Sequence, residues 1–450
     1  WQTISRVVVP SAVSGITAAV ILGMGRAIGE TMAVLMVTGN AAIIPDPLWN
    51  VLSPVRTLTG TLGIEMGEVA IGSAHYHALF GVAVVLLVIT LLVNLAATFI
   101  LARIRQQNAP NVLSCRTEGS LQKERSSLSS RLEPLRPYVL IAIVALLGLP
   151  IAGVPGYFGV ALMGYCLWRL KARVTPKIAQ KVAFTLLLAS TLAVIAILAI
   201  ILSDIIINGL PGLTWEFLTE PPRNLGRAGG IFPALVGTLY LVAGAIAIAL
   251  PLGIGAAIYL TEYTREGRLT RTIRTGTDLL NGTPSIVFGL FGFAFLVLSL
   301  GFGVSLIAGQ VTLALMVLPT IIRTTEESLK NVPLALREGS FALGATRWQT
   351  ISRVVIPPAI PGIITGAILS IGRAAGETAP ILFTAAVFSQ RFLPSSLFEP
   401  VMALPYHLYI LATNVPGADT NKYATALVLL ILVVLIYSVA ILIRTKSQKN

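Results

Sequence analysis

The stretch WQTISRVVIPPAIPGIITGAILSIGRAAGETAPIL occupies residues 348–382, and a near copy, WQTISRVVVPSAVSGITAAVILGMGRAIGETMAVL, occupies residues 1–35. The two stretches align without a gap at an offset of 347. Roughly 60% of their positions are identical, which is too many for two unrelated apolar helices of similar composition. The repeat therefore indicates a duplication, and it predicts two pseudo-symmetric halves.

The composition is that of a polytopic membrane protein. Of the 450 residues, 55% are hydrophobic and 11% are charged, and the mean hydropathy is +0.85. These values exclude a soluble enzyme and a disordered protein. The two cysteines, Cys115 and Cys166, have no metal-ligand spacing and give no disulfide framework. In a membrane protein, a repeated span predicts a pathway that the two halves share.

Apolar runs predict an all-α fold of about ten spans. The region 138–168 is broken by prolines and glycines, and we interpret it as two short helices joined by a turn. The other expected spans lie near residues 13–38, 78–101, 183–207, 231–260, 279–300, 305–322, 359–388 and 423–443.

The basic residues indicate topology. The formal net charge is +13, and lysine and arginine are concentrated in alternate loops, including 102–137 and 169–182, and in the C-terminal tail. Loops with excess positive charge stay in the cytoplasm. We therefore expect a multi-pass protein of a bacterial inner membrane with a cytoplasmic C-terminus and no nucleic-acid partner. Both repeats begin on the cytoplasmic side, so they are parallel.

Each repeat carries an arginine and a glutamate four residues apart inside an expected span: Arg26 with Glu30, and Arg373 with Glu377. A lone charge at such depth costs at least about 2.5 to 3.5 kcal/mol, and this spacing lets the two charges pair on one helix face. One interpretation is an ion pair that only locks two spans together. The other is that both guanidinium groups line the pathway and contact a tetrahedral oxyanion, with hydroxyls from Thr31 and Thr378.

A second feature is the cytoplasmic loop between residues 322 and 359. It predicts one or two short helices with a turn at Gly344, and Pro357 marks the start of the next span. Such a loop is either an ordinary connector or a docking element for a partner. Its central residues are Glu338, Gly339, Ser340, Leu343, Gly344 and Ala345.

These features resemble the permeases of phosphate-specific ABC importers. The loop resembles the family's EAA loop, with EGS at 338–340 in place of the EAA triplet, and GRAIGET and GRAAGET resemble the family's signature span. Further stretches agree in family order: GGIFPALVGTLYL from Gly229, LPLGIGAAIYLTEY from Leu250, NGTPSIVFGLFG from Asn281 and LPTIIRTTEESLKNVP from Leu318.

The resemblance divides the chain into four parts. Residues 183–450 resemble a whole six-span PstA-type subunit, and residues 1–106 resemble the last two spans of a PstC-type subunit. Between them we expect a polar cytoplasmic linker at 107–137 and an apolar hairpin with a basic loop at 138–182. The first copy starts without the segment that precedes its twin, so we expect the chain to be a fragment.

The resemblance implies the MetI-like fold of type I ABC importer permeases and a role in importing inorganic phosphate. Expected partners are a dimer of PstB-like ATPase subunits, a periplasmic or lipid-anchored PstS-like phosphate-binding protein and a second permease half. The chain contains no GxxxxGK[ST] motif to cradle a nucleotide phosphate. We therefore expect no catalytic residue, metal or cofactor in this chain, with ATP used by the partner subunit.

Three alternatives stay open at this point. The same machine could carry sulfate, molybdate or another oxyanion. An ion-coupled secondary transporter would not need the docking loop. An intramembrane enzyme would need a His, Asp or Ser constellation within the spans, and none stands out in the sequence.

Overall fold

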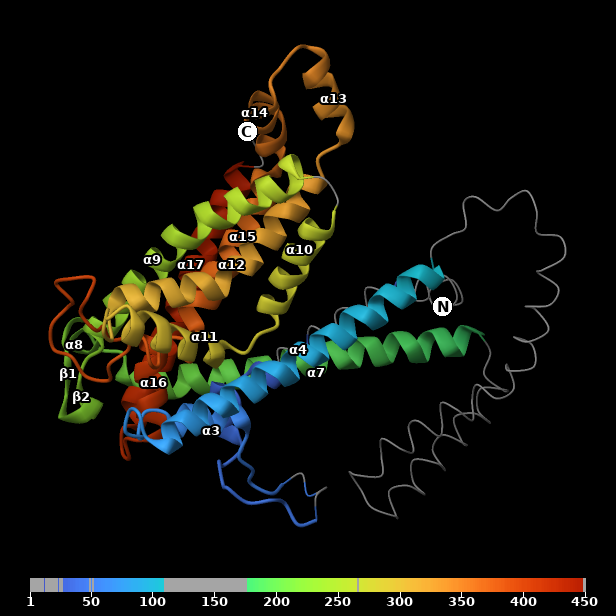
Figure 1. The fold of residues 1–450 in the computed structure, drawn as a ribbon. Helices are drawn as coiled ribbons and strands as arrows, with labels where there is room; N and C mark the ends of the chain where they lie inside the picture. The colour runs from blue at the N-terminus through green and yellow to red at the C-terminus, as the bar shows by residue number, and fades with distance from the viewer. Residues whose placement is uncertain are drawn as a thin grey trace. The chain divides into compact units, whose positions relative to one another are not determined.

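The structure is a computed structural model that describes residues 27–47, 52–108, 176–264 and 267–447, together with residues 12, 23 and 50 (Figure 1). Its described elements are helices and one short strand pair. They are α2 (Met32–Val37), α3 (Leu58–Glu65), α4 (Ala74–Asn108), α7 (Pro176–Gly209), α8 (Trp215–Thr219), β1 (Pro222–Arg223), β2 (Ala228–Gly229), α9 (Phe232–Ile258), α10 (Arg268–Asn281), α11 (Ser285–Gly292), α12 (Leu306–Lys330), α13 (Leu334–Ala342), α14 (Arg347–Thr350), α15 (Ile356–Gly376), α16 (Leu404–Thr413) and α17 (Asp419–Ser447).

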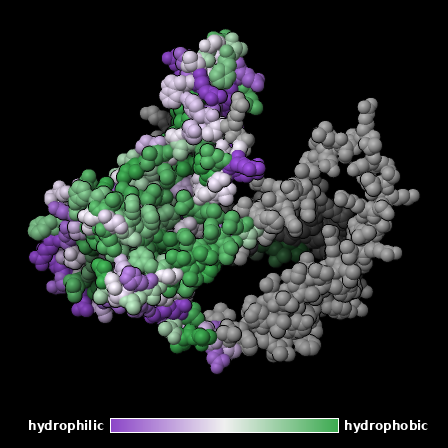
Figure 2. Space-filling model, in the orientation of Figure 1, coloured by the Kyte–Doolittle hydropathy of each residue, from purple (hydrophilic) through white to green (hydrophobic). Residues whose placement is uncertain are grey.

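Six described helices are long and apolar enough to cross a membrane, or seven if α10 and the helix that follows it form one bent span. The six are Ala74–Ala96, Gln180–Gly212, Phe232–Tyr263, Leu306–Lys330, Arg347–Gly376 and Asp419–Leu442. Figure 2 shows apolar side chains over the visible face of the helical body and hydrophilic ones gathered towards its ends. The expected all-helical membrane fold is confirmed. The hairpin at 138–168, the linker from residue 109 onward and half of the span at 13–38 lie outside the described residues.

The chain divides into two compact units. One comprises Trp1–Ile21, Thr38–Arg56 and Ala96–Leu198, and the other comprises Leu22–Val37, Thr57–Leu95 and Ala199–Asn450. In the first unit, a loop is closed by the Val55 amide, which donates to the Thr38 carbonyl at 2.9 Å. The contacts described below all lie within the second unit.

The second unit is built around α9, α12 and α15, which approach one another at small residues. A Cβ atom on Gly244 would overlap the Gln310 side chain, whose amide donates to the Tyr240 carbonyl at 2.9 Å. A Cβ atom on Gly366 would overlap the Thr324 hydroxyl. Small residues at such crossings let helix backbones come close, which is how helices associate in lipid.

The segment that follows the first repeat packs against the second half of the chain. Leu62 of α3 and Leu79 of α4 are buried in one apolar cluster with Ile286 and Leu290 of α11 and with Phe383. The two parts of the duplicated chain therefore share one core in this unit.

Two expected spans differ from the observed helices. The span expected at 359–388 begins earlier, at Arg347, and its helix ends at Gly376. Pro357 lies in the first turn of α15, which begins at Ile356, while the helical run extends further back to Arg347. The span expected at 279–300 is interrupted, because α10 ends at Asn281 and the chain bends by 101° before the helix Ser285–Ser299. We call residues 281–284, which form this bend, the elbow.

Replacing Gly366 with leucine should destabilise the chain, because the side chain would be forced into Thr324 and the neighbouring Ser328, which faces Gly362 in the same way. Overpacking costs about 1–3 kcal/mol, and each kcal/mol should lower the Tm in detergent by about 1 °C in a chain of this length. Gly255→Leu is the matched control, because nothing lies within 4 Å of a Cβ atom at that position of α9. Equal Tm values for the two variants would contradict this packing.

Candidate functional site

Both repeats contain a helix break at the same place. Helix α15 ends at Gly376, and Glu377 has extended backbone with φ −81° and ψ 133°. In the first repeat, residues 27–29 are helical, Glu30 and Thr31 are not, and α2 begins at Met32. Glu30 and Glu377 are equivalent at the offset of 347. The expectation that each glutamate lies within a continuous helix is therefore wrong: each follows the last residue of a helical segment.

The sequence accounts for part of this break. In the second repeat Pro380 has no N–H to donate to the Gly376 carbonyl, so the helix cannot continue with its regular hydrogen bonds. The first repeat has Ala33 at the equivalent position, and there the chain returns to helix within three residues. The shared Gly-Glu-Thr sequence is thus common to both breaks, whereas the proline is not.

Arg373 lies in the last turn of α15 and pairs with Glu377, as the spacing predicted. Its Nε atom is 3.5 Å from Glu377 Oε1, and the two side chains are 22% and 21% exposed. A cation in the last turn is favourable because the C-terminal end of a helix carries partial negative charge. Arg373 Nη1 also donates to Asn281 Oδ1 in the elbow, at 3.5 Å. Neither the sequence spacing nor the repeat indicated this second contact.

The elbow also touches the first repeat. A Cβ atom on Gly29 would lie 3.0 to 3.4 Å from atoms of Pro284, so the helical end of the first repeat packs on the elbow. Thr31 is buried, and its hydroxyl donates to the Gly29 carbonyl at 3.4 Å. The elbow is thus in contact with the helix ends of both repeats.

The remaining predicted pathway residues differ in burial. Thr378 is buried directly after Glu377, whereas Glu30 is exposed. Arg26 lies outside the described residues. Within the described part of the chain, no group of three His, Cys, Asp or Glu side chains could hold a metal ion. The chemistry available here is that of a half-buried guanidinium, a carboxylate, hydroxyls and an amide.

The predicted docking loop forms a projecting helix-turn-helix. Figure 1 shows α13 and α14 beyond the ends of α9, α12 and α15. Gly344 makes the predicted turn, with φ +81°, where a side chain would be strained. Helix α13 has no buried residue, and Leu343 is 90% exposed. The other loop residues singled out from the sequence are exposed or half-buried: Glu338, Gly339, Ser340 and Ala345.

Polar contacts hold this loop rigidly to the helices. Arg337 Nη2 lies 2.9 Å from Glu262 Oε1, and Arg337 also donates to the Leu329 and Val332 carbonyls at 2.8 and 2.6 Å. The Ser340 hydroxyl is 2.9 Å from the Thr350 hydroxyl. The loop therefore presents exposed apolar side chains on a fixed frame.

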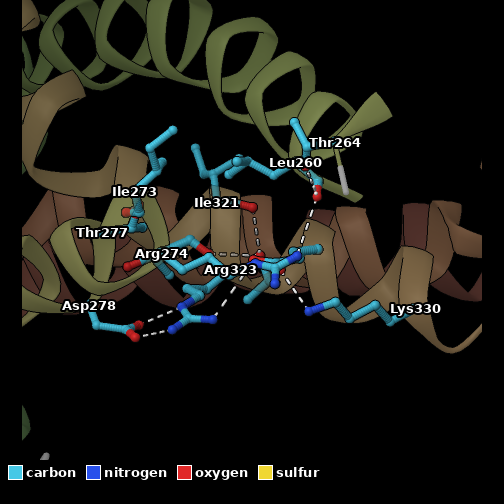
Figure 3. A network of polar contacts seen from close by, with 12 residues as sticks. Leu260, Thr264, Ile273, Arg274, Thr277, Asp278, Ile321, Arg323 and Lys330 are labelled. Carbon is cyan, nitrogen blue, oxygen red and sulfur yellow. Dashed lines mark hydrogen bonds and ion pairs between the residues drawn. The ribbon is translucent and has the colours of Figure 1, made fainter. Parts of the chain in front are cut away.

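A cluster of ion pairs between α10 and α12 was not predicted (Figure 3). Glu326 is only 2% exposed, and its carboxylate lies 2.6 Å from Arg274 Nε and 2.7 Å from Lys330 Nζ. Arg323 lies 3.8 Å from the same carboxylate and also pairs with Asp278. The pairing of Glu326 with Lys330 could have been predicted from the sequence, because residues four apart on a helix lie on the same face. The pairing with Arg274 and Asp278 of α10 could not have been predicted in this way, because these residues come from a different helix.

The second part of the chain matches a family model. Residues 249–449 match the model described as binding-protein-dependent transport system inner membrane component.

Several known proteins are similar over about half of the chain. The probable ABC transporter permease protein YqgI of Bacillus subtilis is 36% identical over 272 residues, which is 57% of this chain and 92% of that protein. The phosphate transport system permease protein PstA of Yersinia pestis is 39% identical over 255 residues, which is 56% of this chain and 84% of that protein. PstA 1 of Mycobacterium tuberculosis is 41% identical over 225 residues, which is 50% of this chain and 73% of that protein.

The helical membrane fold, the projecting loop and relatives matched over most of their length agree with one another. The chain belongs to the family of inner-membrane components of binding-protein-dependent transport systems, the ABC transporter permeases.

Proposed function

We propose that this chain is a permease subunit of an ATP-driven importer and forms the translocation pathway for inorganic phosphate. The observation that carries the proposal is the half-buried Arg373, which lies at a helix break beside the elbow that the first repeat also contacts. The relatives named as phosphate transport system permeases support the choice of substrate.

The chemistry of the site fits a tetrahedral oxyanion. A guanidinium group offers planar pairs of N–H donors that match two oxygens of a phosphate. Glu377 is 3.5 Å from the Arg373 guanidinium, so this pairing orients the side chain without forming a short hydrogen bond. By the repeat, Arg26 and Glu30 supply the second half of the pathway, and Thr31 and Thr378 supply hydroxyls. The Arg373 guanidinium, whose carboxylate partner is 3.5 Å away, would attract an anion into a region where an isolated charge is costly.

The partners follow from the family and from the projecting loop. An ATPase dimer would bind at the surface of α13 and hydrolyse ATP, so this chain would bind no cofactor of its own. A phosphate-binding protein would deliver the substrate on the opposite side. A second permease half would complete the pathway, and the resemblance of residues 1–106 to a PstC-type subunit indicates its nature.

The position of the docking loop also indicates on which side of the inner membrane the C-terminus would lie. Figure 1 shows the C-terminal end of α17 at the same end of the helical body as α14. The C-terminus would therefore lie on the side of the docking loop, which is the cytoplasm, in agreement with its basic residues.

The rival functions have less support. The names of the relatives favour phosphate over sulfate or molybdate. Membership of a family of binding-protein-dependent systems speaks against an ion-coupled secondary transporter, which needs no ATPase docking loop.

Arg373→Gln should reduce phosphate uptake by at least about tenfold, because hydrogen bonds to charged groups contribute roughly 1.5–3 kcal/mol. Uptake would be measured in proteoliposomes that contain the assembled transporter, ATP and the phosphate-binding protein, with sulfate and molybdate as competitors. Arg391→Gln, in an exposed loop, is the matched control and should leave uptake unchanged. An Arg373→Gln chain that fails to assemble would instead favour a purely structural ion pair.

Leu343→Arg should uncouple the chain from its ATPase, because this exposed leucine lies at the turn of the docking loop and supports no buried contact. The Tm of the isolated chain should be unchanged, while copurification of the ATPase and ATP-dependent uptake should be lost. Leu397→Arg, at another leucine that is 51% exposed, should retain the ATPase. Normal uptake by Leu343→Arg would show that the ATPase binds elsewhere.

A further inference from the structure

We propose that Asn281 is the positioning residue for Arg373, and that it must be a neutral amide so that the guanidinium keeps its charge for the anion. This inference rests on the proposed function and adds to it a residue outside both repeats. Asn281 is the last residue of α10 and the first residue of the elbow. It therefore lies where two helical segments meet at a sharp bend.

The polar contacts of Arg373 leave part of its hydrogen-bonding capacity unused. Nε faces Glu377 at 3.5 Å without a hydrogen bond, and Nη1 donates to Asn281 Oδ1. In the described part of the chain, Nη2 makes no hydrogen bond. A guanidinium carries five N–H donors, so several of them can still donate to the oxygens of an oxyanion.

Asn281 is itself held in place by a third helix. The Thr320 hydroxyl of α12 donates to Asn281 Oδ1 at 3.2 Å. The same oxygen thus accepts from Thr320 on α12 and from Arg373 on α15. This shared acceptor fixes the direction of the guanidinium from a helix other than the one that carries it.

The choice of an amide has an electrostatic reason. An aspartate at this position would have nearly the same shape, but it would place a second carboxylate against Arg373. Two carboxylates would more than neutralise the guanidinium and repel an incoming anion. An asparagine accepts the same hydrogen bond without adding charge. Among the described residues, Glu377 is therefore the carboxylate that pairs with Arg373, and Asn281 adds no second one.

The test measures the KM and kcat of phosphate uptake by the assembled transporter in proteoliposomes. Asn281→Asp should raise KM at least about tenfold, since like-charge juxtaposition opposes anion binding. The double variant Asn281→Asp/Glu377→Gln keeps one carboxylate beside Arg373. Its KM should return to within about threefold of the wild-type value, because the two positions are coupled through Arg373. A residue that only packs the elbow would show no such rescue.

The controls separate charge from folding. Asn414→Asp adds the same charge at an exposed position and should leave KM unchanged. Asn281→Ala removes the acceptor without adding charge and should raise KM by a smaller factor of about three to ten, the loss of one hydrogen bond. If the Asn281→Asp chain does not assemble into the transporter, Asn281→Ala is the deciding variant. An unchanged KM in Asn281→Ala would then overturn the inference. An unchanged KM in an assembled Asn281→Asp, or a double variant that is no better, overturns it as well.

Failure of this inference is distinguishable from failure of the proposed function. If Arg373→Gln takes up phosphate normally, the pathway assignment fails and the role of Asn281 fails with it. If Arg373→Gln is inactive while Asn281→Asp is normal, only the role of Asn281 is wrong.

Discussion

The placement of a charge within an apolar helical body is the constraint on which the rest of the structure depends. An arginine within a span costs several kcal/mol unless it is paired, so its neighbours must be polar and held in place. Arg373 meets this constraint with a carboxylate on its own chain segment and an amide from the elbow. Both partners lie at interruptions of helices, where the backbone of a span is no longer regular. Interrupted backbone in a membrane is tolerated only where protein or water surrounds it, and here Thr378 and Pro284 are buried in protein.

The repeat, the membrane fold, the two short helices with a turn at Gly344 and the pairing of Arg373 with Glu377 could be predicted from the sequence, because each depends on local spacing or on composition. The end of α15 at Gly376 could not, because the following residues are as apolar as a span. Hydropathy does not separate a lipid-facing helix from irregular backbone that is buried inside the protein. Asn281 was missed for another reason: it lies 92 positions from Arg373, and one sequence carries no signal of such a contact.

Side-chain contacts link α10 and α12 at three positions along their length. These contacts connect the docking loop with the candidate pathway. Asp278 pairs with Arg323, and about one turn further along the two helices Asn281 accepts from Thr320. Glu326 adds a third link, because its buried carboxylate contacts cations from both helices. A buried carboxylate with several cationic partners is costly to separate from them. The two helices are therefore bound to move as one body.

The docking loop is attached to the same body. Arg337 of α13 donates to carbonyls at and just beyond the end of α12, one of them that of Leu329. A displacement of α13 by a bound partner would act on α12 through Arg337, and on the helical run that contains α15 through the Ser340–Thr350 contact. Arg373 belongs to α15, which crosses α12 at small residues and is not part of the ion-pair cluster. Movement of the α10–α12 body relative to α15 would change the distance between Asn281 and Arg373, and with it the direction in which the guanidinium points.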